Sequence, residues 1–420
     1  MTNILDELKW RGLLADVTDE QALARHLEAG PVAFYVGFDP TAPSLHHGNL
    51  VQLIVARILQ EAGHKPVILV GGSTGMIGDP KESGERVLSS PEVVGAWAAR
   101  ITSQVSKFID LEGPNCAIVV NNLDWTGPMP VIDFLTDIGK HFPVNRMLGR
   151  EVVKARLDAG ISYTEFSYVL LQAMDYLELF RRHHCTLQFG GSDQWGNITA
   201  GVELIRRSLG EKVHALATPL LTRADGTKFG KSEGGAVWLD PELTSPYAFH
   251  QVFLQAEDAQ VIQYLKVFSS RTADEIDDLA RQTEEHPERR AAQHALADDV
   301  TALVHSPQDV EAANQASAAL FGRADLAELS PQALGSAMAG IGAVDLYGSD
   351  LPSVVDALEA SGVVASKSAA RRTIAEGGAY LNNAKVVDPD SRITPADLLA
   401  GRYLVMRRGK RTVGGLVIHS

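Results

Sequence analysis

Two short segments, far apart in the chain, contain residue types that could bind and activate a nucleotide. In the first, strand-forming residues 34–38 run into a turn with two prolines, after which His46-His47-Gly48-Asn49 opens a helical pattern. Glycine lets the backbone approach a ligand closely, and a helix N-terminus offers N–H groups and a positive dipole end to phosphates. An ordinary strand–helix turn with incidental histidines is the alternative interpretation of this segment taken alone.

The second segment surrounds a glycine with two lysines and a hydroxyl: Lys228, Lys231 and Ser232 lie on either side of Gly230. Such a cationic loop can neutralise the charge that builds on a transferring phosphoryl group and on its leaving group. Taken alone, the segment could equally be a solvated surface turn. The pairing of the two segments in this order and at this distance is much more specific than either segment alone.

The sequence around these segments predicts an α/β fold. Short apolar runs alternate with helical patterns through the first half, which is typical of a parallel sheet covered by helices. The expected strands are 32–38, 66–70, 117–120, 186–189 and 214–218, and the expected helices include 50–62 and 165–180. Open α/β sheets bind ligands at the carboxyl ends of their strands, where the Gly- and Pro-rich turns fall.

The rest of the chain predicts further domains. Apolar residues at helical spacing indicate a helical domain, an Ala/Gly/Ser/Pro-rich stretch indicates a linker, and two short helices followed by strands 379–381 and 403–407 indicate a small α+β domain. The expected division is 1–240 for a catalytic domain with an insert, 241–325 for the helical domain, 326–350 for the linker and 351–420 for the tail domain.

Composition and charge limit the cellular compartment and the kinds of binding partner that we expect. The net charge of −14 argues against a protein that coats nucleic acid non-specifically. From Asp350 to Ser420, however, ten Lys and Arg residues stand against seven Asp and Glu, and a basic tail on an acidic body suggests a polyanionic partner. With two cysteines, no signal-peptide pattern and no long apolar run, we expect a cytoplasmic protein without disulfides or structural zinc.

Together, the two segments resemble the HIGH and KMSKS signatures of class I aminoacyl-tRNA synthetases. Further stretches narrow the resemblance to the bacterial-type tyrosyl-tRNA synthetase family: Gly71–Pro80, Asn121–Trp125, Glu165–Asp175 and Gly190–Asn197. The resemblance covers essentially the whole chain. It implies a Rossmann-like parallel-sheet catalytic domain, an α-helical domain that contacts the anticodon region, and an S4-like RNA-binding tail.

The resemblance also implies roles for individual residues. For tyrosine it implies Tyr35, Asp39, Asp79, Asn122, Tyr168, Gln172, Asp175 and Gln194. For ATP it implies Thr41, His46, Gly48, Asn49, Gly191, Asp193, Lys228 and Lys231, and for catalysis His46, Asn49, Lys228, Lys231 and Ser232. For RNA it implies Arg371 and Arg372. Asn49 replaces the second histidine of the family motif, which keeps a hydrogen-bond donor and loses the option of charge.

Elementary physical chemistry supports the residues that the resemblance assigns to tyrosine binding. A buried phenol hydroxyl needs hydrogen-bond partners, which the resemblance assigns to Tyr35 and Asp175. An α-ammonium group needs acceptors, and Asp79 is one of the positions assigned to it. Residues 168, 172 and 175 are spaced to lie on one face of one helix.

The implied reaction joins L-tyrosine to ATP and then transfers the tyrosine to the 3′ end of tRNA(Tyr). Mg²⁺ is expected with ATP, held mainly by phosphates and water rather than by a protein metal site, and no tightly bound cofactor is expected. The family also implies a homodimer formed through the insert. Two alternatives stay open: a tryptophanyl-tRNA synthetase, which shares the fold, and a non-catalytic RNA-binding protein with a synthetase shell. Tyr35 with Asp175 argues against the first alternative, and the lysines of the second segment argue against the other.

Overall fold

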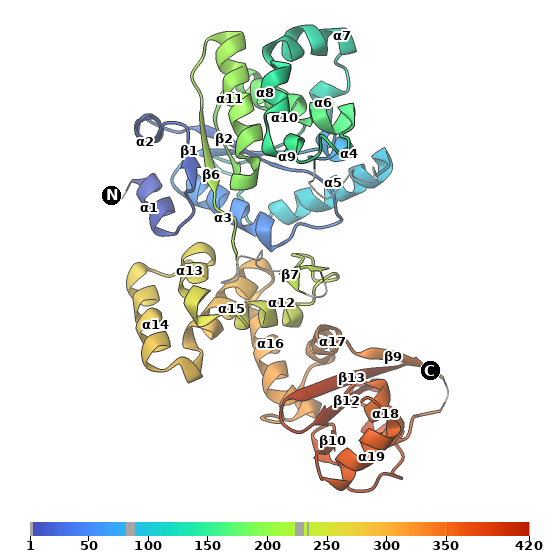
Figure 1. Cartoon of the computed structure of the whole chain (residues 1–420). Coiled ribbons are helices and arrows are strands. Elements are labelled where there is room, and N and C mark those ends of the chain that lie inside the picture. The colour runs from blue at the N-terminus through green and yellow to red at the C-terminus, as the bar shows by residue number, and fades with distance from the viewer. Residues whose placement is uncertain (1–2, 81–88, 223–230, 233–234, 349, 420) are drawn as a thin grey trace. The chain divides into compact units, whose positions relative to one another are not determined.

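The computed structural model describes residues 3–80, 89–222, 231–232, 235–348 and 350–419. These residues form two compact units, each discontinuous in sequence (Figure 1). The first comprises Met1–Leu239 and Ile262–Ile276, and the second comprises Asp240–Val261 and Asp277–Ser420. No helix in the described ranges is both long enough and apolar enough to cross a membrane.

The first unit is built on a six-stranded sheet in the order β1-β6-β5-β2-β3-β4. Its strands are β1 (Asp16–Val17), β2 (Ala33–Phe38), β3 (Lys65–Val70), β4 (Ile118–Asn121), β5 (Cys185–Gly191) and β6 (His214–Thr218). Strands β2 to β6 are mutually parallel, whereas β1, which the sequence analysis missed, pairs antiparallel with β6. The predicted α/β class and its five strands are confirmed.

The order of the strands fixes where a ligand can bind. From β2 the chain builds outward through β3 and β4, and it then returns to place β5 against the other edge of β2. The direction of winding therefore reverses between β2 and β5. In open parallel sheets, ligands bind at the carboxyl ends of the strands beside such a reversal.

Helices α10 and α11 cover one face of this sheet, and α3 and α5 cover the other (Figure 1). The helices before β4 are α1 (Ile4–Trp10), α2 (Glu20–Glu28), α3 (His47–Glu61), α4 (Thr74–Ile77) and α5 (Pro91–Val105). The insert between β4 and β5 holds α6 (Leu123–Thr126), α7 (Val131–Asp133), η1 (Phe134–Ile138), η2 (Gly139–His141), α8 (Val144–Leu148), α9 (Glu151–Lys154) and α10 (Tyr163–His183). After β5 come η3 (Ser192–Gln194) and α11 (Trp195–Leu209).

The second unit combines helices with a smaller sheet. Its helices are α12 (Pro246–Leu254), α15 (Ala291–Val304), α16 (Pro307–Leu320), α17 (Pro331–Gly340), α18 (Val354–Ala360) and α19 (Lys367–Ala375). The residues of α13 (Asp258–Phe268) and α14 (Ala273–Glu285) are divided between the two units. The sheet has the order β11-β10-β12-β13-β9. Its strands are β9 (Val344–Tyr347), β10 (Ala379–Leu381), β11 (Ala384–Lys385), β12 (Tyr403–Arg408) and β13 (Thr412–His419).

Residues 326–350 differ from the predicted linker, because they form regular elements. Helix α17 packs into a hydrophobic cluster with α12 and α16, and β9 extends the C-terminal sheet beside β13. The small residues that suggested flexibility instead allow close packing. A Cβ atom on Gly340 would lie 2.5 Å from the ring of Tyr247, and one on Gly335 would lie 3.0 Å from the hydroxyl of Tyr403.

Candidate active site

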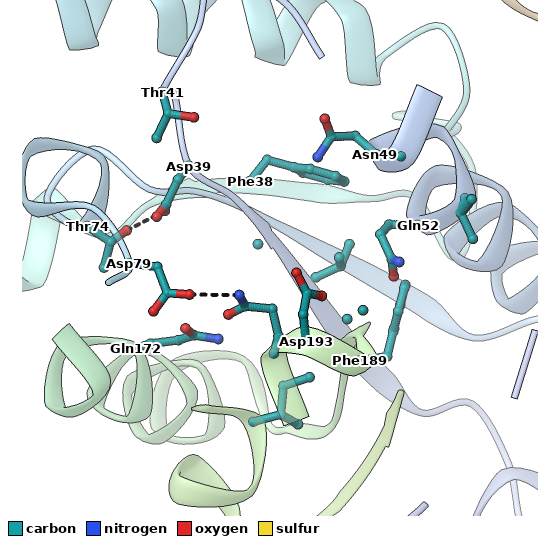
Figure 2. A pocket seen from close by; sticks show the side chains of 18 of the residues that line it. Phe38, Asp39, Thr41, Asn49, Gln52, Thr74, Asp79, Gln172, Phe189 and Asp193 are labelled. Atoms are coloured by element: carbon teal, nitrogen blue, oxygen red, sulfur yellow. Dashed lines mark hydrogen bonds between the residues drawn. The ribbon is translucent and has the colours of Figure 1, made fainter. Parts of the chain in front are cut away.

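A cavity of about 930 Å³ lies at the carboxyl ends of β2 and β5. Most of the predicted site residues line it: Tyr35, Asp39, Thr41, His46, Gly48, Asn49, Asp79, Tyr168, Gln172, Asp175, Gly191, Asp193 and Gln194. Figure 2 shows two groups of side chains facing each other across it, with Asp39, Thr74, Asp79 and Gln172 on one side and Asn49, Gln52 and Phe189 on the other. The two groups suggest separate sites for two parts of a ligand.

Tyr35 and Asp175 form a buried polar pair in the wall of the cavity. Tyr35 comes from the middle of β2, and Asp175 from α10, and each is 2% exposed. Among the described residues, the hydroxyl of Tyr35 has no hydrogen-bond partner. Burial, and secondly the neighbouring carboxyl of Asp175, raise the pKa of Tyr35 well above its ordinary value, so the phenol is neutral. A neutral phenol with an unused hydroxyl can bind another polar group.

Two neutral donors hold the carboxyl of Asp175 in place. The Nδ2 atom of Asn122 donates to Oδ2 at 3.0 Å, and the indole Nε1 of Trp125 donates to Oδ1 at 2.8 Å. Burial raises the pKa of Asp175 to about 8, although both of these hydrogen bonds act to lower it. A carboxylate oxygen can accept more than one hydrogen bond. Asp175 therefore keeps acceptor capacity toward the cavity.

Asn122 has a different place from the one that the sequence predicted. It is fully buried and is absent from the lining of the cavity. Its amide donates to Thr74 Oγ1 at 2.9 Å as well as to Asp175, and its carbonyl accepts from the backbone N–H of Ser73 at 2.8 Å. Asn122 therefore orients cavity residues from behind rather than lining the cavity itself.

Asp39, at the end of β2, joins the first network to α10. Its Oδ2 accepts from the hydroxyl of Tyr168 at 2.7 Å, and its Oδ1 accepts from Thr74 Oγ1 at 2.7 Å. Burial and the carboxylate of Asp39 raise the pKa of Tyr168 well above its ordinary value. Because the Tyr168 proton is donated to Asp39, the lone pairs of its hydroxyl remain available to accept from a cation. Gln172, one turn along α10, has an Oε1 atom without a hydrogen-bond partner among the described residues.

Asp79 belongs to a second network, centred on the segment after β5. Its Oδ2 accepts from Gln194 Nε2 at 2.8 Å, and its Oδ1 accepts from Asn197 Nδ2 at 3.1 Å. Arg150, from the insert, donates to Asn197 in turn. Asp39 and Asp79 lie on the same side of the cavity (Figure 2). Together with Tyr168 and Gln172 they make that side suitable for an ammonium group.

The N-terminus of α3 confirms the predicted helix start and explains its glycine. His46 is the N-cap residue: its Nδ1 accepts from the N–H of Gly48 at 3.0 Å, which places the proton of a neutral ring on Nε2. The side chain of Asn49 accepts from the N–H of His46 at 3.1 Å, which completes a capping box. A Cβ atom on Gly48 would lie 2.9 Å from the imidazole. Asn49 thus has a structural role that the sequence analysis did not predict.

The other predicted nucleotide residues fall into two groups. Thr41, Gly191 and Asp193 line the cavity. Gly191 and Asp193 lie at the end of β5, and a Cβ atom on Gly191 would lie 2.5 Å from Asp193 Oδ1. Lys228 lies outside the described residues. The backbone of Lys231 and Ser232 forms the short strand β7, which pairs with β8 (Gly235–Ala236), and their side chains also lie outside the description.

Gln52 is a cavity residue that the sequence analysis missed. It lies on α3, and its Nε2 donates to Thr218 Oγ1 at 2.7 Å. This hydrogen bond fixes the amide, and its Oε1 atom is buried without a partner among the described residues. The position of Gln52 six residues after His46, within the first two turns of the predicted helix, was the available signal. Gln52 therefore offers a fixed acceptor on the side of the cavity opposite Asp79 (Figure 2).

Comparison with known proteins connects this geometry to a family. The sequence model of tRNA synthetases class I (W and Y) matches residues 27–322, and that of the tyrosine–tRNA ligase SYY-like C-terminal domain matches residues 335–413. The tyrosine–tRNA ligase of Cutibacterium acnes is 60% identical over 99% of this chain and 100% of its own length. The tyrosine–tRNA ligase of Streptomyces coelicolor is 56% identical over 100% of this chain and 99% of its own. This chain belongs to the tyrosine–tRNA ligase family.

Solved structures agree with this family. A C-terminally truncated mitochondrial tyrosyl-tRNA synthetase from Aspergillus nidulans is 30% identical, with a TM-score of 0.67 over 74% of this chain and 92% of that one. A tryptophanyl-tRNA synthetase from Encephalitozoon cuniculi has a TM-score of 0.55 over 72% of this chain and 86% of that one, but is 14% identical and shares the fold alone. Identity to the tyrosine enzymes thus argues against the tryptophan alternative.

The ligase family's C-terminal domain includes the two arginines predicted to bind RNA. Arg371 and Arg372 lie next to each other on α19, and both are exposed. Arg371 forms an ion pair with the exposed carboxylate of Asp390 at 3.1 Å. An exposed pair of this kind is weak, so Arg371 can exchange its partner for a phosphate.

Proposed function

We propose that the cavity first joins L-tyrosine to ATP, and then transfers the tyrosine to tRNA(Tyr). Tyrosine–tRNA ligase activity follows from family membership at up to 60% identity over the full chain. The proposal adds which residues of this chain hold each part of the substrates. The observation that carries it is the buried pair of Tyr35 and Asp175, because a phenol hydroxyl needs one donor and one acceptor.

The tyrosine hydroxyl binds between these two residues. Asp175 accepts its proton, and the hydroxyl of Tyr35 donates to its oxygen. A bound phenol that donates to Asp175 stabilises the ionised carboxylate, which burial otherwise disfavours. With phenylalanine the hydroxyl of Tyr35 would stay buried without a partner, which costs about 1–3 kcal/mol. Asp175 would keep only its hydrogen bonds from Asn122 and Trp125. The pocket therefore selects the phenol.

The α-ammonium group binds on the side of Asp79, Tyr168 and Gln172. The hydroxyl oxygen of Tyr168 and Oε1 of Gln172 accept from it, and the carboxylate of Asp79 supplies the opposite charge. Asp39 keeps Tyr168 in its acceptor orientation, and Gln194 keeps Asp79 in place. This arrangement leaves the substrate carboxylate directed toward the nucleotide.

The nucleotide binds at the N-terminus of α3 and the end of β5. His46 donates through Nε2, Gly48 and Thr41 allow the phosphates to approach, and Gly191 and Asp193 hold the ribose. Gln52 accepts from a donor group of the nucleoside. Asn49 contributes its remaining amide N–H groups as well as the helix cap. Helix N-termini stabilise anionic groups in this way.

In the first step the tyrosine carboxylate attacks the α-phosphorus in line, and pyrophosphate leaves. The carboxylate is already a nucleophile, so the protein contributes orientation and charge stabilisation rather than a base. We assign Lys228, Lys231 and Ser232 to the developing charge on the pyrophosphate. Mg²⁺ enters with ATP, coordinated by phosphates and water; within the described residues, no cluster of acidic, histidine or cysteine side chains could hold a metal ion.

In the second step a hydroxyl of the terminal ribose of tRNA attacks the tyrosyl carbonyl, and AMP leaves. The α19 face with Arg371 and Arg372 holds the RNA backbone, and raised salt should weaken this contact by counterion release. We place the enzyme in the cytoplasm, in agreement with its two unpaired cysteines.

A homodimer forms through the insert. Large apolar side chains are exposed on α7, η1, α8, the turn after α9 and the first residue of α10: Val131, Ile132, Leu135, Val144, Leu148, Leu157 and Tyr163. Val131 and Ile132 are 69% and 64% exposed, and such clusters mark association surfaces. Replacing Ile132 by Glu should convert a dimer to a monomer in light scattering. A monomeric parent protein would contradict this assignment.

ATP–pyrophosphate exchange tests the proposed activity, run separately with tyrosine, phenylalanine and tryptophan. We expect exchange with tyrosine, together with charging of tRNA(Tyr). Exchange that depends equally on phenylalanine, or on tryptophan alone, would contradict the pocket assignment.

A further inference from the structure

Strand β12 carries a charged residue at a buried position. Successive side chains of a strand point to opposite faces of its sheet. Leu404 and Met406 belong to the hydrophobic cluster with α18 and α19, whereas Tyr403 and Val405 belong to the cluster with α12, α16 and α17. By this alternation Arg407 points to the face of α16 and α17, and it is 8% exposed.

The partners of the Arg407 guanidinium are all neutral. Nη1 donates to the carbonyl of Gly409 at 2.9 Å, and Cζ lies 4.3 Å from the ring centroid of Tyr380, the residue directly opposite on β10. Among the residues described here, Arg407 forms no ion pair, and its Nε atom has no hydrogen-bond partner. A buried cation of this kind requires some other source of electrostatic stabilisation.

The carboxyl end of α16 supplies this stabilisation. After Leu320 the N–H of Gly322 donates to Ala319 O at 3.1 Å and that of Arg323 donates to Ala318 O at 2.8 Å, the pattern of a left-handed helix ending. Gly322 has a φ of +75°, and a Cβ atom on it would lie 3.1 Å from Arg407 Nη2. The guanidinium thus lies at the negative end of the helix dipole, and α16 has no basic residue in its own last turn.

Asn383 reaches the same helix end from another part of the sheet. It lies in the turn between β10 and β11 with a φ of 68°, a left-handed conformation that asparagine tolerates. Its Nδ2 donates to Ala319 O at 2.7 Å. A side chain from the β10–β11 turn and one from β12 therefore meet at one helix terminus, beside an apolar cluster that the helix and the sheet share.

We propose that Asn383 and Arg407 are positioning residues for tRNA charging, which lock the C-terminal sheet onto the end of α16. The inference rests on the RNA-binding role proposed above for the C-terminal domain. With the lock in place, α12, α16, α17 and the sheet form one rigid RNA-binding body. Loosening it would let RNA bound on α19 shift relative to α16, so that fewer complexes present the RNA correctly.

Two substitutions in the full-length protein test the lock. Asn383→Gly removes the side chain and keeps a residue that accepts a positive φ, and Arg407→Met keeps the apolar stem and removes the charge. For both we expect unchanged tyrosine-dependent ATP–pyrophosphate exchange and a KM for tRNA raised roughly threefold to tenfold, the range expected for one lost hydrogen bond. Amide hydrogen exchange at Gly322 and Arg323 should become faster, while the amides shared by β12 and β13 stay protected.

Arg408→Met is the matched control, because Arg408 is the next residue on β12 and is exposed. A raised KM for tRNA without faster amide exchange at Gly322 identifies direct RNA contact. If Arg408→Met gives that result, the proposed lock still stands. If Asn383→Gly gives it, the lock is overturned. Wild-type values of both quantities in Asn383→Gly would also overturn the lock, as would loss of protection throughout β12 and β13. A parent protein that fails to charge tRNA would contradict the proposed function instead, since amide exchange reports the lock independently.

Discussion

Asp175 and Arg407 are both buried ionisable groups with neutral partners, but their surroundings differ. Asp175 accepts from Asn122 and Trp125 on one side and borders the cavity on the other. Arg407 is enclosed by its own chain, between Tyr380, the Gly409 carbonyl and the end of α16. The first arrangement leaves acceptor capacity for a ligand. The second arrangement leaves no side open to a ligand, as expected of a residue that holds one structural element against another.

The largest expected effect separates the two residues by activity. Asp175→Ala should lower kcat/KM for tyrosine in ATP–pyrophosphate exchange by about 100-fold or more, because the phenol loses a charged partner. Arg407→Met should leave this exchange at the wild-type level. Circular dichroism of both variants provides the folding control. Equal losses in the two folded variants would remove the distinction drawn here.

A second expected effect separates them by pH. Burial raises the pKa of Asp175 from 3.8 to about 8, so the folded state binds this proton more tightly than the unfolded state. Ionising the buried carboxyl therefore costs stability progressively as pH rises from about 4 to about 8. We expect the free energy of unfolding of Asp175→Asn to rise relative to wild type across that interval, by roughly 6 kcal/mol in total, and to level off above it.

Urea titrations at several pH values would measure this difference. Arg407→Met serves as the comparison, because it leaves the carboxyl of Asp175 in place, so its stability difference from wild type should not vary with pH over this interval. A constant difference for Asp175→Asn would show that its carboxyl does not titrate there.

A smaller effect should follow from removing one of the groups that hold Asp175. Trp125→Phe keeps the aromatic packing but deletes the indole N–H that donates to Oδ1. We expect KM for tyrosine to rise about tenfold, the effect of one hydrogen bond to a charged group. KM for ATP should stay unchanged in the same assay. If both values rose together, the indole would be supporting the whole cavity rather than Asp175.

The smallest expected effect concerns the nucleotide side, where Gln52 also has an unused acceptor. Gln52→Met should raise KM for ATP about fivefold and leave KM for tyrosine unchanged. Thr218→Val, which removes only the group that fixes the amide, should have a weaker effect of the same kind. Comparing ATP with its 2′-deoxy, 3′-deoxy and inosine analogues would identify the donor that Gln52 binds. An unchanged KM for ATP in Gln52→Met would exclude this contact.

Residues whose role depends on local pattern could be predicted from the sequence. The five parallel strands, the start of α3 at His46 and the shared face of Tyr168, Gln172 and Asp175 all follow from spacing within one element. The side chains that line the cavity were largely found because the family resemblance places them at strand ends.

Residues that act through another residue could not be found in this way. No role was predicted from the sequence for Trp125, and Asn122 was assigned to the tyrosine site, yet both hold Asp175 from behind. Asn49 caps α3 through a hydrogen bond that only the folded backbone defines. Helix α17 was predicted to be part of a linker because a composition rich in small residues suggests flexibility. In the structure the same small residues allow close packing. The contacts of Asn122, Trp125 and α17 are long-range, whereas the Asn49 cap joins residues only three positions apart.

The discrimination between tyrosine and phenylalanine tests the central claim most directly. The ratio of kcat/KM for the two amino acids in ATP–pyrophosphate exchange should be measured for the wild type and for Tyr35→Phe, which removes only the buried hydroxyl. The account predicts that the substitution lowers kcat/KM for tyrosine by about tenfold and raises it for phenylalanine, because a buried unpaired group is no longer left in that complex. An unchanged ratio would contradict the assignment of Tyr35 and Asp175 as the site that recognises the phenol.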